Sequence, residues 1–299
     1  MKVTYMARYP DLICIGAQKS ASTWLYQMLE WRDEIFMPAI KEIHYFSQIY
    51  NSDGDVRNYG PAHRIHQAKD VKDYLASKPS LGCKDKSTLA QIEHLVSAEV
   101  DDEWYAQVFA PARDDQVCIE VCPSYMNMPE AAVQHVLRLN PTVHLLAIVR
   151  DPVERCWSHI RMHIMQGLLG HDLSGIVNGG VDLWPYLFYT DYAGALGRWR
   201  SYSAPGQLKL ILYDQVLAEP NAVLEDVYSF AGLPKPRPTP ERALRREVFK
   251  GGDLKLPPDV RKKLLEELEP QYEYLRSCFP DTVDSWLLKH SAIINMHDN

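Results

Sequence analysis

The chain of 299 residues is long enough for one large hydrophobic core or two small ones. Its hydrophobic share of 46% and its charged share of 24% are ordinary for a soluble globular protein. The net charge of −7 argues against a general nucleic-acid-binding protein, whose affinity depends on neutralising phosphates, but it leaves room for a local anion site.

Short apolar runs bounded by turn signals predict buried strands, and helical periodicity lies between them. The predicted strands are 11–16, 117–122, 143–149 and 208–213. The predicted helices lie near 22–32, 129–139, 153–167, 183–202, 221–231 and 257–276. Strands that alternate with helices predict an α/β fold, with a central, mostly parallel sheet flanked by helices. Because no repeat or flexible linker divides the chain, we expect a single domain over 1–299, with its core at about 10–290.

The first predicted strand leads into a polar turn and then a helix, in DLICIGAQKSASTWLYQML (11–29). Small or hydrogen-bonding residues surround one cation there, Lys19. A turn between a strand and a helix often holds a phosphate-like anion, because free backbone N–H groups and the helix dipole favour negative charge. The spacing differs from the nucleoside-triphosphate P-loop, GxxxxGK[ST], since Lys19 follows Gly16 by three residues. An ordinary turn with a surface lysine is the alternative.

The second informative stretch is VHLLAIVRDPVERCWSHIRMHI (143–164). Arg150 follows its apolar strand, at the carboxyl end where open α/β sheets bind ligands. The acidic residue and proline that come next indicate a helix start, and this helix carries Arg155 and Ser158. The alternative is that both arginines are exposed and pair with the acidic residues beside them.

Together the two stretches resemble the sulfotransferases that use 3′-phosphoadenosine-5′-phosphosulfate (PAPS). In that family a K-S-[GA]-[ST]-[ST] turn binds the 5′-phosphosulfate, and a strand ending in R-[DN]-P-x-x-R-x-x-S binds the 3′-phosphate. This chain has K-S-A-S-T at 19–23 and R-D-P-V-E-R-C-W-S at 150–158. Ala21 stands where many members have glycine, and alanine accepts a positive φ less readily. The resemblance implies the P-loop-NTPase-like sulfotransferase fold.

Further segments extend the resemblance over most of residues 10–290, toward the bacterial and carbohydrate-type branches. They are PAIKEIHYFS (38–47), IEVCPSYM (119–126), YTDYAGALGRWRSY (189–202), LKLILYDQVLAEPNAVLEDVYSFAGLP (208–234) and VFKGGDLKLPPDVRKKL (248–264). The last of these resembles a loop that closes over the nucleotide. Some members have a lysine after the glutamate of the second segment, but Val121 follows Glu120 here. Glu120 and Tyr125 are expected on the acceptor side.

The resemblance implies that PAPS is the donor, that 3′-phosphoadenosine-5′-phosphate (PAP) is the product, and that no metal is required. Lys19 would meet the charge that grows on the leaving 5′-phosphate, and Arg150 and Ser158 would bind the 3′-phosphate. Adenine would stack on Trp24, Phe249 or another aromatic residue. The residues implied in nucleotide binding are Lys19, Ser20, Ala21, Ser22, Thr23, Trp24, Arg150, Ser158, Phe249, Lys250, Gly251 and Gly252.

The acceptor must lose a proton, and KEIH (41–44) offers titratable groups for this step. Glu42 is our first choice as catalytic base, because a glutamate in the matching place has this role in the carbohydrate branch, and His44 is the second. An extended segment would place both side chains on one face. A general base that works near neutrality would need an elevated pKa. The alternatives are a surface ion pair between Glu42 and Lys41, and a structural role for His44.

Two other functions stay open at this stage. One is a P-loop-type ATP-dependent kinase, against which the position of Lys19 counts, and the other is a non-catalytic nucleotide-binding protein on the same fold. The expected acceptor is a hydroxyl or amine of a small molecule or carbohydrate, and we expect no nucleic-acid partner. No pattern names the acceptor or the oligomeric state.

The remaining patterns concern location and metals. No apolar run approaches the ~20 residues of a membrane span, and the first residues lack the apolar core of a signal peptide. Six cysteines without a C-x-x-C pair, several of them in apolar strands, favour a reduced, cytoplasmic protein. His159 and His163 have a spacing that zinc sites use, but no acidic third ligand accompanies them, so we expect helix-surface histidines.

Overall fold

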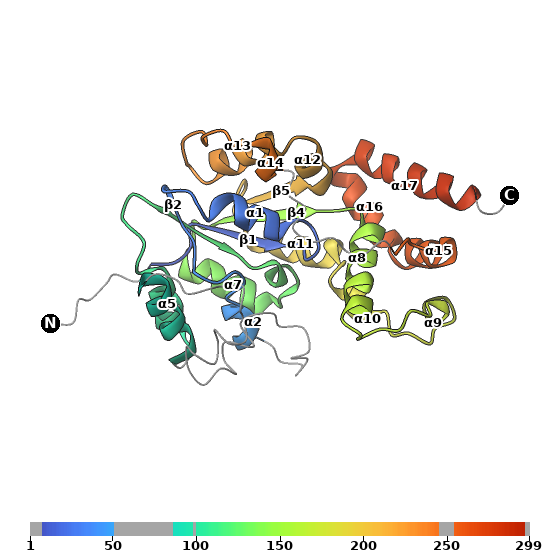
Figure 1. The fold of residues 1–299 in the computed structure, drawn as a ribbon, viewed down its shortest axis with the longest axis horizontal. Helices are drawn as coiled ribbons and strands as arrows, with labels where there is room; N and C mark the ends of the chain where they lie inside the picture. The colour runs from blue at the N-terminus through green and yellow to red at the C-terminus, as the bar shows by residue number, and fades with distance from the viewer. Residues whose placement is uncertain (1–7, 51–85, 98–99, 245–253, 297–299) are drawn as a thin grey trace.

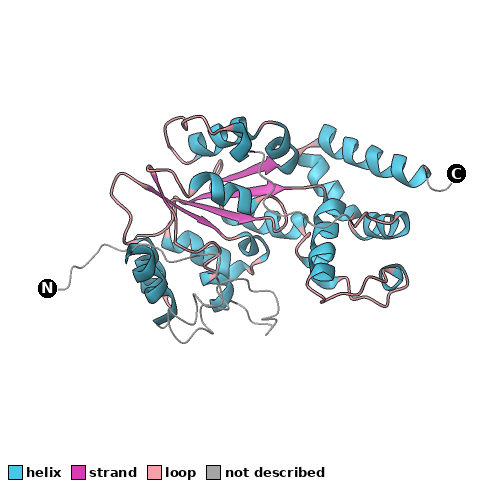
Figure 2. Cartoon of the chain, viewed as in Figure 1, coloured by secondary structure: helices cyan, strands magenta, loops and turns pink. Residues whose placement is uncertain are grey.

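The protein is represented by a computed structural model that describes residues 8–50, 86–97, 100–244 and 254–296. One five-stranded sheet lies between layers of helices (Figures 1 and 2). The strand order is β2-β3-β1-β4-β5, and every pairing among the described residues is parallel, so the predicted α/β fold is confirmed. The strands are β1 (Leu12–Gly16), β2 (Ile35–Phe36), β3 (Val117–Val121), β4 (His144–Val149) and β5 (Leu208–Leu212).

Both faces of the sheet are covered, because successive strand residues point to opposite sides. On one face, Leu12 and Cys14 of β1 belong to a core cluster with residues of four helices. On the other face, Ile13 and Ile15 belong to a larger cluster. The helices of the first cluster are α1 (Ser22–Leu29), α12 (Tyr213–Ala218), α13 (Pro220–Phe230) and α14 (Glu241–Leu244). The larger cluster includes residues of α2 (Tyr45–Ile49), α5 (Lys86–Ser97), α6 (Asp102–Phe109), η3 (Pro123–Asn127), α7 (Glu130–Leu139), α8 (Pro152–Met165), α9 (Ser174–Val177), α10 (Trp184–Phe188), α11 (Tyr192–Tyr202), α15 (Pro258–Glu267), α16 (Glu269–Cys278) and α17 (Pro280–Asn295).

The topology brings two loops together at one edge of the sheet. β1 lies between β3 and β4, and Gly16 at its end is in register with Ala147 of β4. The chain leaves β1 toward β2 and β3, whereas it leaves β4 toward β5 on the opposite side. Ligands of open parallel sheets bind at such a change of direction, outside the carboxyl ends of the strands. Gly16 is required there, since a Cβ would lie 2.7 Å from the Cβ of Met126.

Several elements differ from the sequence predictions. The helix expected at 183–202 is divided into α10 and α11, because Asp191 caps α11 by accepting a hydrogen bond from the Gly194 amide. The helix expected at 257–276 is divided into α15 and α16, and Pro270 lies in the first turn of α16, where its missing N–H costs nothing. β2, α5, α6 and α17 are among the elements that were not predicted. Within the described ranges, no helix is long and apolar enough to cross a membrane.

Candidate active site

The turn between β1 and α1 contains two non-glycine residues in the left-handed region. Lys19 has a φ of 66° and Ala21 has a φ of 65°. Such a conformation costs about 1–2 kcal/mol per residue and persists where the surroundings enforce it. Ala21 is the N-cap of α1, and the first intrahelical bond runs from the Leu25 amide to the Ala21 carbonyl oxygen. The amides of residues 22–24 therefore have no partner within the helix and point out of its N-terminus.

Arg150, at the end of β4, reaches this turn. Its Nη1 donates a hydrogen bond to the carbonyl oxygen of Lys19 at 3.0 Å. Its guanidinium also lies over the ring of Tyr213, 4.5 Å from the centroid. The structure thus brings together the two residues that the sequence placed on separate loops. The contact between Arg150 and Lys19 also argues against the alternative interpretation, an ordinary turn with a surface lysine.

Arg155 is fully buried, which corrects the alternative of an exposed arginine paired with neighbouring acids. Its Nε donates to the Gln18 carbonyl oxygen at 3.1 Å. Its Nη1 donates to the Tyr186 carbonyl oxygen and to Thr190 Oγ1, both at 2.8 Å. Arg155 therefore ties the turn before Lys19 to the junction between α10 and α11. One signal for Arg155 is visible in the sequence, because it is the second arginine of the R-D-P-x-x-R pattern.

Four basic residues lie around Lys19, and we call the five together the cation cluster. Burial, together with four neighbouring cations, lowers the pKa of Lys19 from 10.5 to about 8. Lys19 Nζ also lies 3.6 Å from the sulfur of Met162. Mutually repelling cations at a helix N-terminus favour a bound anion, which would relieve the repulsion. The cluster consists of Lys19, Lys41, Arg150, Arg155 and Arg161.

Glu42 and His44 lie beside the cluster, but not in the extended segment that we expected. Their φ angles are 66° and 58°, so both residues are left-handed. Their side chains still meet, with His44 Nε2 3.5 Å from a carboxylate oxygen of Glu42. Glu42 also pairs with Lys41, but both side chains are at most one-fifth exposed, so this is not the surface ion pair of the alternative interpretation. Although burial opposes ionisation, Lys41 and His44 hold the pKa of Glu42 at about 2, opposite to the elevated value wanted for a general base.

Residues at and after the end of β3 contact this left-handed segment on its buried side. Glu120 is buried and accepts hydrogen bonds from the hydroxyls of Tyr105 at 2.5 Å and Tyr125 at 3.0 Å, and from the Ile43 backbone. Burial raises the pKa of the Glu120 carboxyl to about 7. Ser124 Oγ lies 3.0 Å from Nδ1 of His44. Glu120 and Tyr125 thus support the segment from beneath instead of lining an acceptor surface, which corrects the expectation from sequence.

The other predicted nucleotide residues have mixed placements. Ser20 and Ser22 are buried in the turn, Thr23 is half-buried, and Ser158 is half-buried on α8. Trp24 is buried, and its indole N–H donates to the Leu244 carbonyl oxygen of α14 at 3.0 Å. Phe249, Lys250, Gly251 and Gly252 lie outside the described residues.

The two histidines of α8 differ from the surface residues that we expected. His159 is buried, and its Nδ1 accepts a hydrogen bond from Arg155 Nη2 at 3.1 Å. Burial, with Arg155 and His163 nearby, lowers the pKa of His159 to about 2, so it is neutral. Nδ1 of His163 lies 2.9 Å from the hydroxyl of Tyr186. Over the described ranges, no group of three or more His, Cys, Asp or Glu residues could hold a metal ion.

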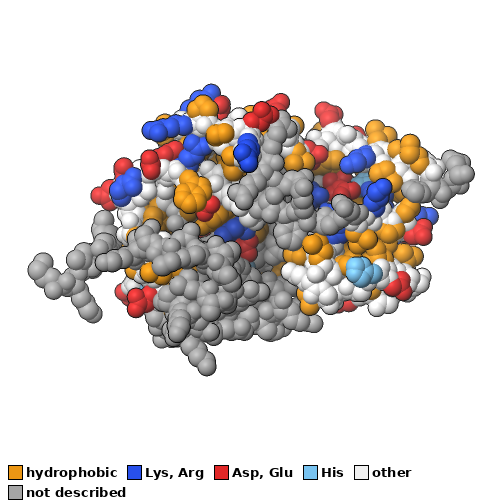
Figure 3. Space-filling model, in the orientation of Figure 1, with side chains coloured by type: hydrophobic (Ala, Val, Ile, Leu, Met, Phe, Trp, Pro, Cys, Tyr) orange, Lys and Arg blue, Asp and Glu red, His pale blue; other side chains and the backbone are white. Residues whose placement is uncertain are grey.

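Exposed apolar side chains follow Met162 along the chain. Four large apolar side chains between α8 and α10 are at least two-fifths exposed, and Figure 3 shows apolar side chains gathered in this part of the molecule. The first of them lies about one helical turn after Met162 on the same helix. The four are Met165, Leu168, Val177 and Trp184.

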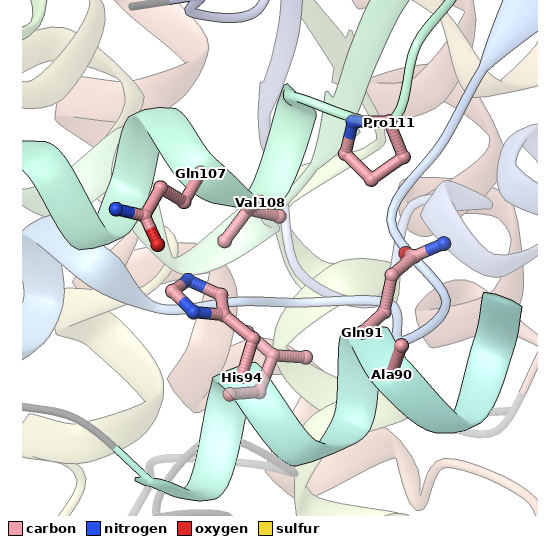
Figure 4. Close-up of a pocket in the computed structure, with 7 residues that line it drawn as sticks. Ala90, Gln91, His94, Gln107, Val108 and Pro111 are labelled. Carbon is pink, nitrogen blue, oxygen red and sulfur yellow. The ribbon is translucent and has the colours of Figure 1, made fainter. Parts of the chain in front are cut away.

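A separate pocket lies between α5 and α6 and contains no member of the cation cluster (Figure 4). Two of its polar side chains are engaged elsewhere. Gln91 accepts a hydrogen bond from the Ala39 amide, and His94 Nε2 lies 2.9 Å from the Trp104 carbonyl oxygen. The pocket wall therefore helps to hold the segment that leads to Glu42. Its lining residues are Ala90, Gln91, His94, Leu95, Gln107, Val108 and Pro111.

The chain belongs to the sulfotransferase family, whose model matches residues 10–237. Among solved structures, it resembles a sulfotransferase from Alicyclobacillus acidocaldarius, with a TM-score of 0.63, 20% identity, and coverage of 94% of this chain and 99% of that one. It also resembles a sulfotransferase domain from the curacin biosynthetic pathway, with a TM-score of 0.51, 17% identity, and coverage of 80% and 77%. A third similar structure is the sulfotransferase domain of the Synechococcus PCC 7002 olefin synthase, with a TM-score of 0.50, 15% identity, and coverage of 90% and 97%. Comparison with curated proteins gave no match.

Proposed function

We propose that the protein is a single-domain, PAPS-dependent sulfotransferase that acts on a hydroxyl or amine of a small molecule or carbohydrate. The observation that carries the proposal is the cation cluster, in which Arg150 bonds the backbone of Lys19 at the edge where β1 and β4 end. A donor with phosphates at both the 5′ and 3′ positions needs cationic contacts for each of them, and Lys19 and Arg150 come from two different loops that meet at this edge. Family membership supports transfer of a sulfuryl group over transfer of a phosphoryl group by a kinase.

In this proposal, the residues of the β1–α1 turn bind the 5′ end of the donor. Lys19 and the amides of residues 22–24 would contact the 5′-phosphate, on which charge grows as its bond to sulfur breaks. Preorganised donors of this kind contribute roughly 3–4 kcal/mol each to the transition state. Arg150 and Ser158 would contact the 3′-phosphate, and Arg150 has the planar fork that suits phosphate oxygens. PAP is the product, and no step requires a metal.

The acceptor oxygen or nitrogen would attack sulfur in line with the leaving 5′-phosphate oxygen. One bond to sulfur forms while the other breaks, and the acceptor's proton passes to a base. We propose Glu42 as that base, because it lies beside the cation cluster and is ionised at neutral pH. Its ion pair with Lys41 must loosen before Glu42 becomes a stronger base. His44, within 3.5 Å of Glu42, is the second candidate.

A thermal-shift panel tests the proposal with PAP, AMP, ADP and ATP plus magnesium. A ligand at ~100 times its Kd should stabilise the protein by about 2.7 kcal/mol. We expect PAP to stabilise it most and Arg150→Ala to abolish the preference. Arg276→Ala is the matched control, because Arg276 is an exposed arginine of α16 that pairs with Asp284. An equal or larger response to ATP would reject the proposal in favour of a kinase.

Turnover with labelled PAPS and a panel of acceptors separates an enzyme from a non-catalytic nucleotide-binding protein. We expect label transfer that falls sharply in Lys19→Met, because charge on the leaving phosphate loses its cation. The non-catalytic alternative predicts that the protein binds PAP but transfers label to no acceptor, and that Glu42→Gln leaves this binding unchanged.

A further inference from the structure

A buried polar network holds the residue that follows Arg150. Asp151 is the N-cap of α8, and its carboxylate accepts a hydrogen bond from the Glu154 amide at 3.1 Å. The same carboxylate accepts from the Tyr272 hydroxyl and from Nε2 of His290, both at 2.8 Å. Asp151 is 5% exposed and His290 is 0% exposed. A buried carboxylate with this many donors is fixed in place.

Arg261 determines which ring nitrogen of His290 carries the hydrogen. Its Nη1 lies 2.5 Å from Nδ1 of His290 and 3.4 Å from a carboxylate oxygen of Glu154. Because a guanidinium has only donors, Nδ1 of His290 must accept, and Nε2 must carry the hydrogen that it donates to Asp151. Arg261 therefore donates a hydrogen bond to His290, and His290 donates one to Asp151.

The network is formed by helices at the far end of the chain. Arg261 belongs to α15, Tyr272 to α16 and His290 to α17, and Figure 1 shows these helices beside α8. The family model ends at residue 237, so it assigns no role to any of the three. Tyr272 also accepts a hydrogen bond from the Val153 amide at 3.3 Å, so the whole first turn of α8 is held from this side.

We propose that His290 and Arg261 are positioning residues for the 3′-phosphate site. By holding Asp151 and the first turn of α8, they fix where Arg150 and Ser158 project. The C-terminal helices then determine how strongly the protein prefers a nucleotide with a 3′-phosphate. This inference rests on the proposed function, because it presupposes that Arg150 binds that phosphate.

The test compares the ratio of the Kd for AMP to the Kd for PAP, since the two ligands differ only by the 3′-phosphate. In His290→Leu we expect the ratio to fall about tenfold, within the ordinary range of coupling between sites. His290→Gln should keep most of the ratio, because the glutamine amide can still donate to Asp151. Val283→Ala is the control, since Val283 is a buried apolar residue of α17 outside the network.

A merely structural role for His290 predicts a different result. Val283→Ala and His290→Leu would then both lower the Tm and leave the ratio within about twofold of the wild type, well below ordinary coupling. That outcome overturns the inference while the proposed function stands. A wild-type protein with no preference for PAP over AMP overturns both.

A measurement on the wild-type protein covers the case in which His290→Leu does not fold. Coupling between sites is reciprocal, so PAP should slow amide hydrogen exchange around Arg261 and His290 more than saturating AMP does. Equal protection by the two nucleotides in α15 and α17 would overturn the inference.

Discussion

The affinity for PAP should fall as the pH rises above 8, because Lys19 loses its proton in the unliganded protein. Burial and neighbouring cations lower its pKa from 10.5 to about 8. At about 1.4 kcal/mol per pKa unit, this shift means that lost hydration and repulsion together destabilise the charged form of Lys19 by about 3 kcal/mol. A phosphate between the cations removes the repulsion and returns the pKa toward 10.5. The bound state then holds more protons than the unliganded state, so binding weakens with rising pH.

The size of the effect follows from the fraction of protonated Lys19. With a pKa of about 8, roughly nine-tenths of the unliganded protein carries the charge at pH 7 and roughly one-tenth at pH 9. The Kd for PAP should therefore rise about tenfold over this range, with about one proton taken up per ligand at pH 9. Titration calorimetry in buffers of different ionisation enthalpy measures both quantities at constant ionic strength.

Lys19→Arg is the control for this experiment, because a guanidinium stays charged across the range. Its Kd for PAP should be nearly independent of pH between 7 and 9. A flat wild-type profile, or the same slope in Lys19→Arg, would refute the assignment of the titration to Lys19.

Three further predictions concern the free energy of unfolding, measured by denaturant titration. Ala21→Gly should raise it by about 1 kcal/mol, because glycine adopts the φ of 65° without strain, and a loss of stability would contradict the left-handed cap. Gly16→Ala should lower it by about 1–3 kcal/mol through the clash with Met126, and a neutral effect would argue against that close approach. Glu42, with its pKa lowered from 4.5 to about 2, stabilises the protein above pH 4.5, and this contribution is lost as the pH falls toward 2. Glu42→Gln should remove up to about 3 kcal/mol of this stability, and an unchanged loss of stability between pH 4.5 and pH 2 in the variant would contradict the lowered pKa of Glu42.

The strands that form the centre of the sheet could be predicted from sequence because they are buried on both faces. β1 and residues 145–149 of β4 are unbroken apolar runs, and each strand is followed by a loop with a recognisable pattern. β2 has only two residues, too few to show a period. The division between α10 and α11 depends on the Asp191 cap, which a pattern of aromatic residues across 186–199 conceals.

The candidate site was predictable only where its chemistry is local. Lys19 and Arg150 stand out because each follows a strand, and parallel strands end at the same edge. The burial of Arg155 was not predictable, because its partners Gln18 and Tyr186 come from distant segments and arginine is exposed by default. The left-handed backbone at Glu42 was not predictable either, and the hydrogen bond between Glu120 and the Ile43 backbone beside it joins segments that are far apart in the sequence.

The central position of β1 has a consequence for biosynthesis. β1 is made before both of its neighbours in the sheet, since Leu12 pairs with Ile119 on one side and with His144 on the other. Until both partners leave the ribosome, the nascent strand has unpaired edges that invite association with other chains, and such long-range parallel pairing is slow. A chain terminated at residue 237 would contain Lys19 and Arg150 but would lack His290, which bonds Asp151 from α17, so under the proposed assignment we expect recognition of the 3′-phosphate to require α17.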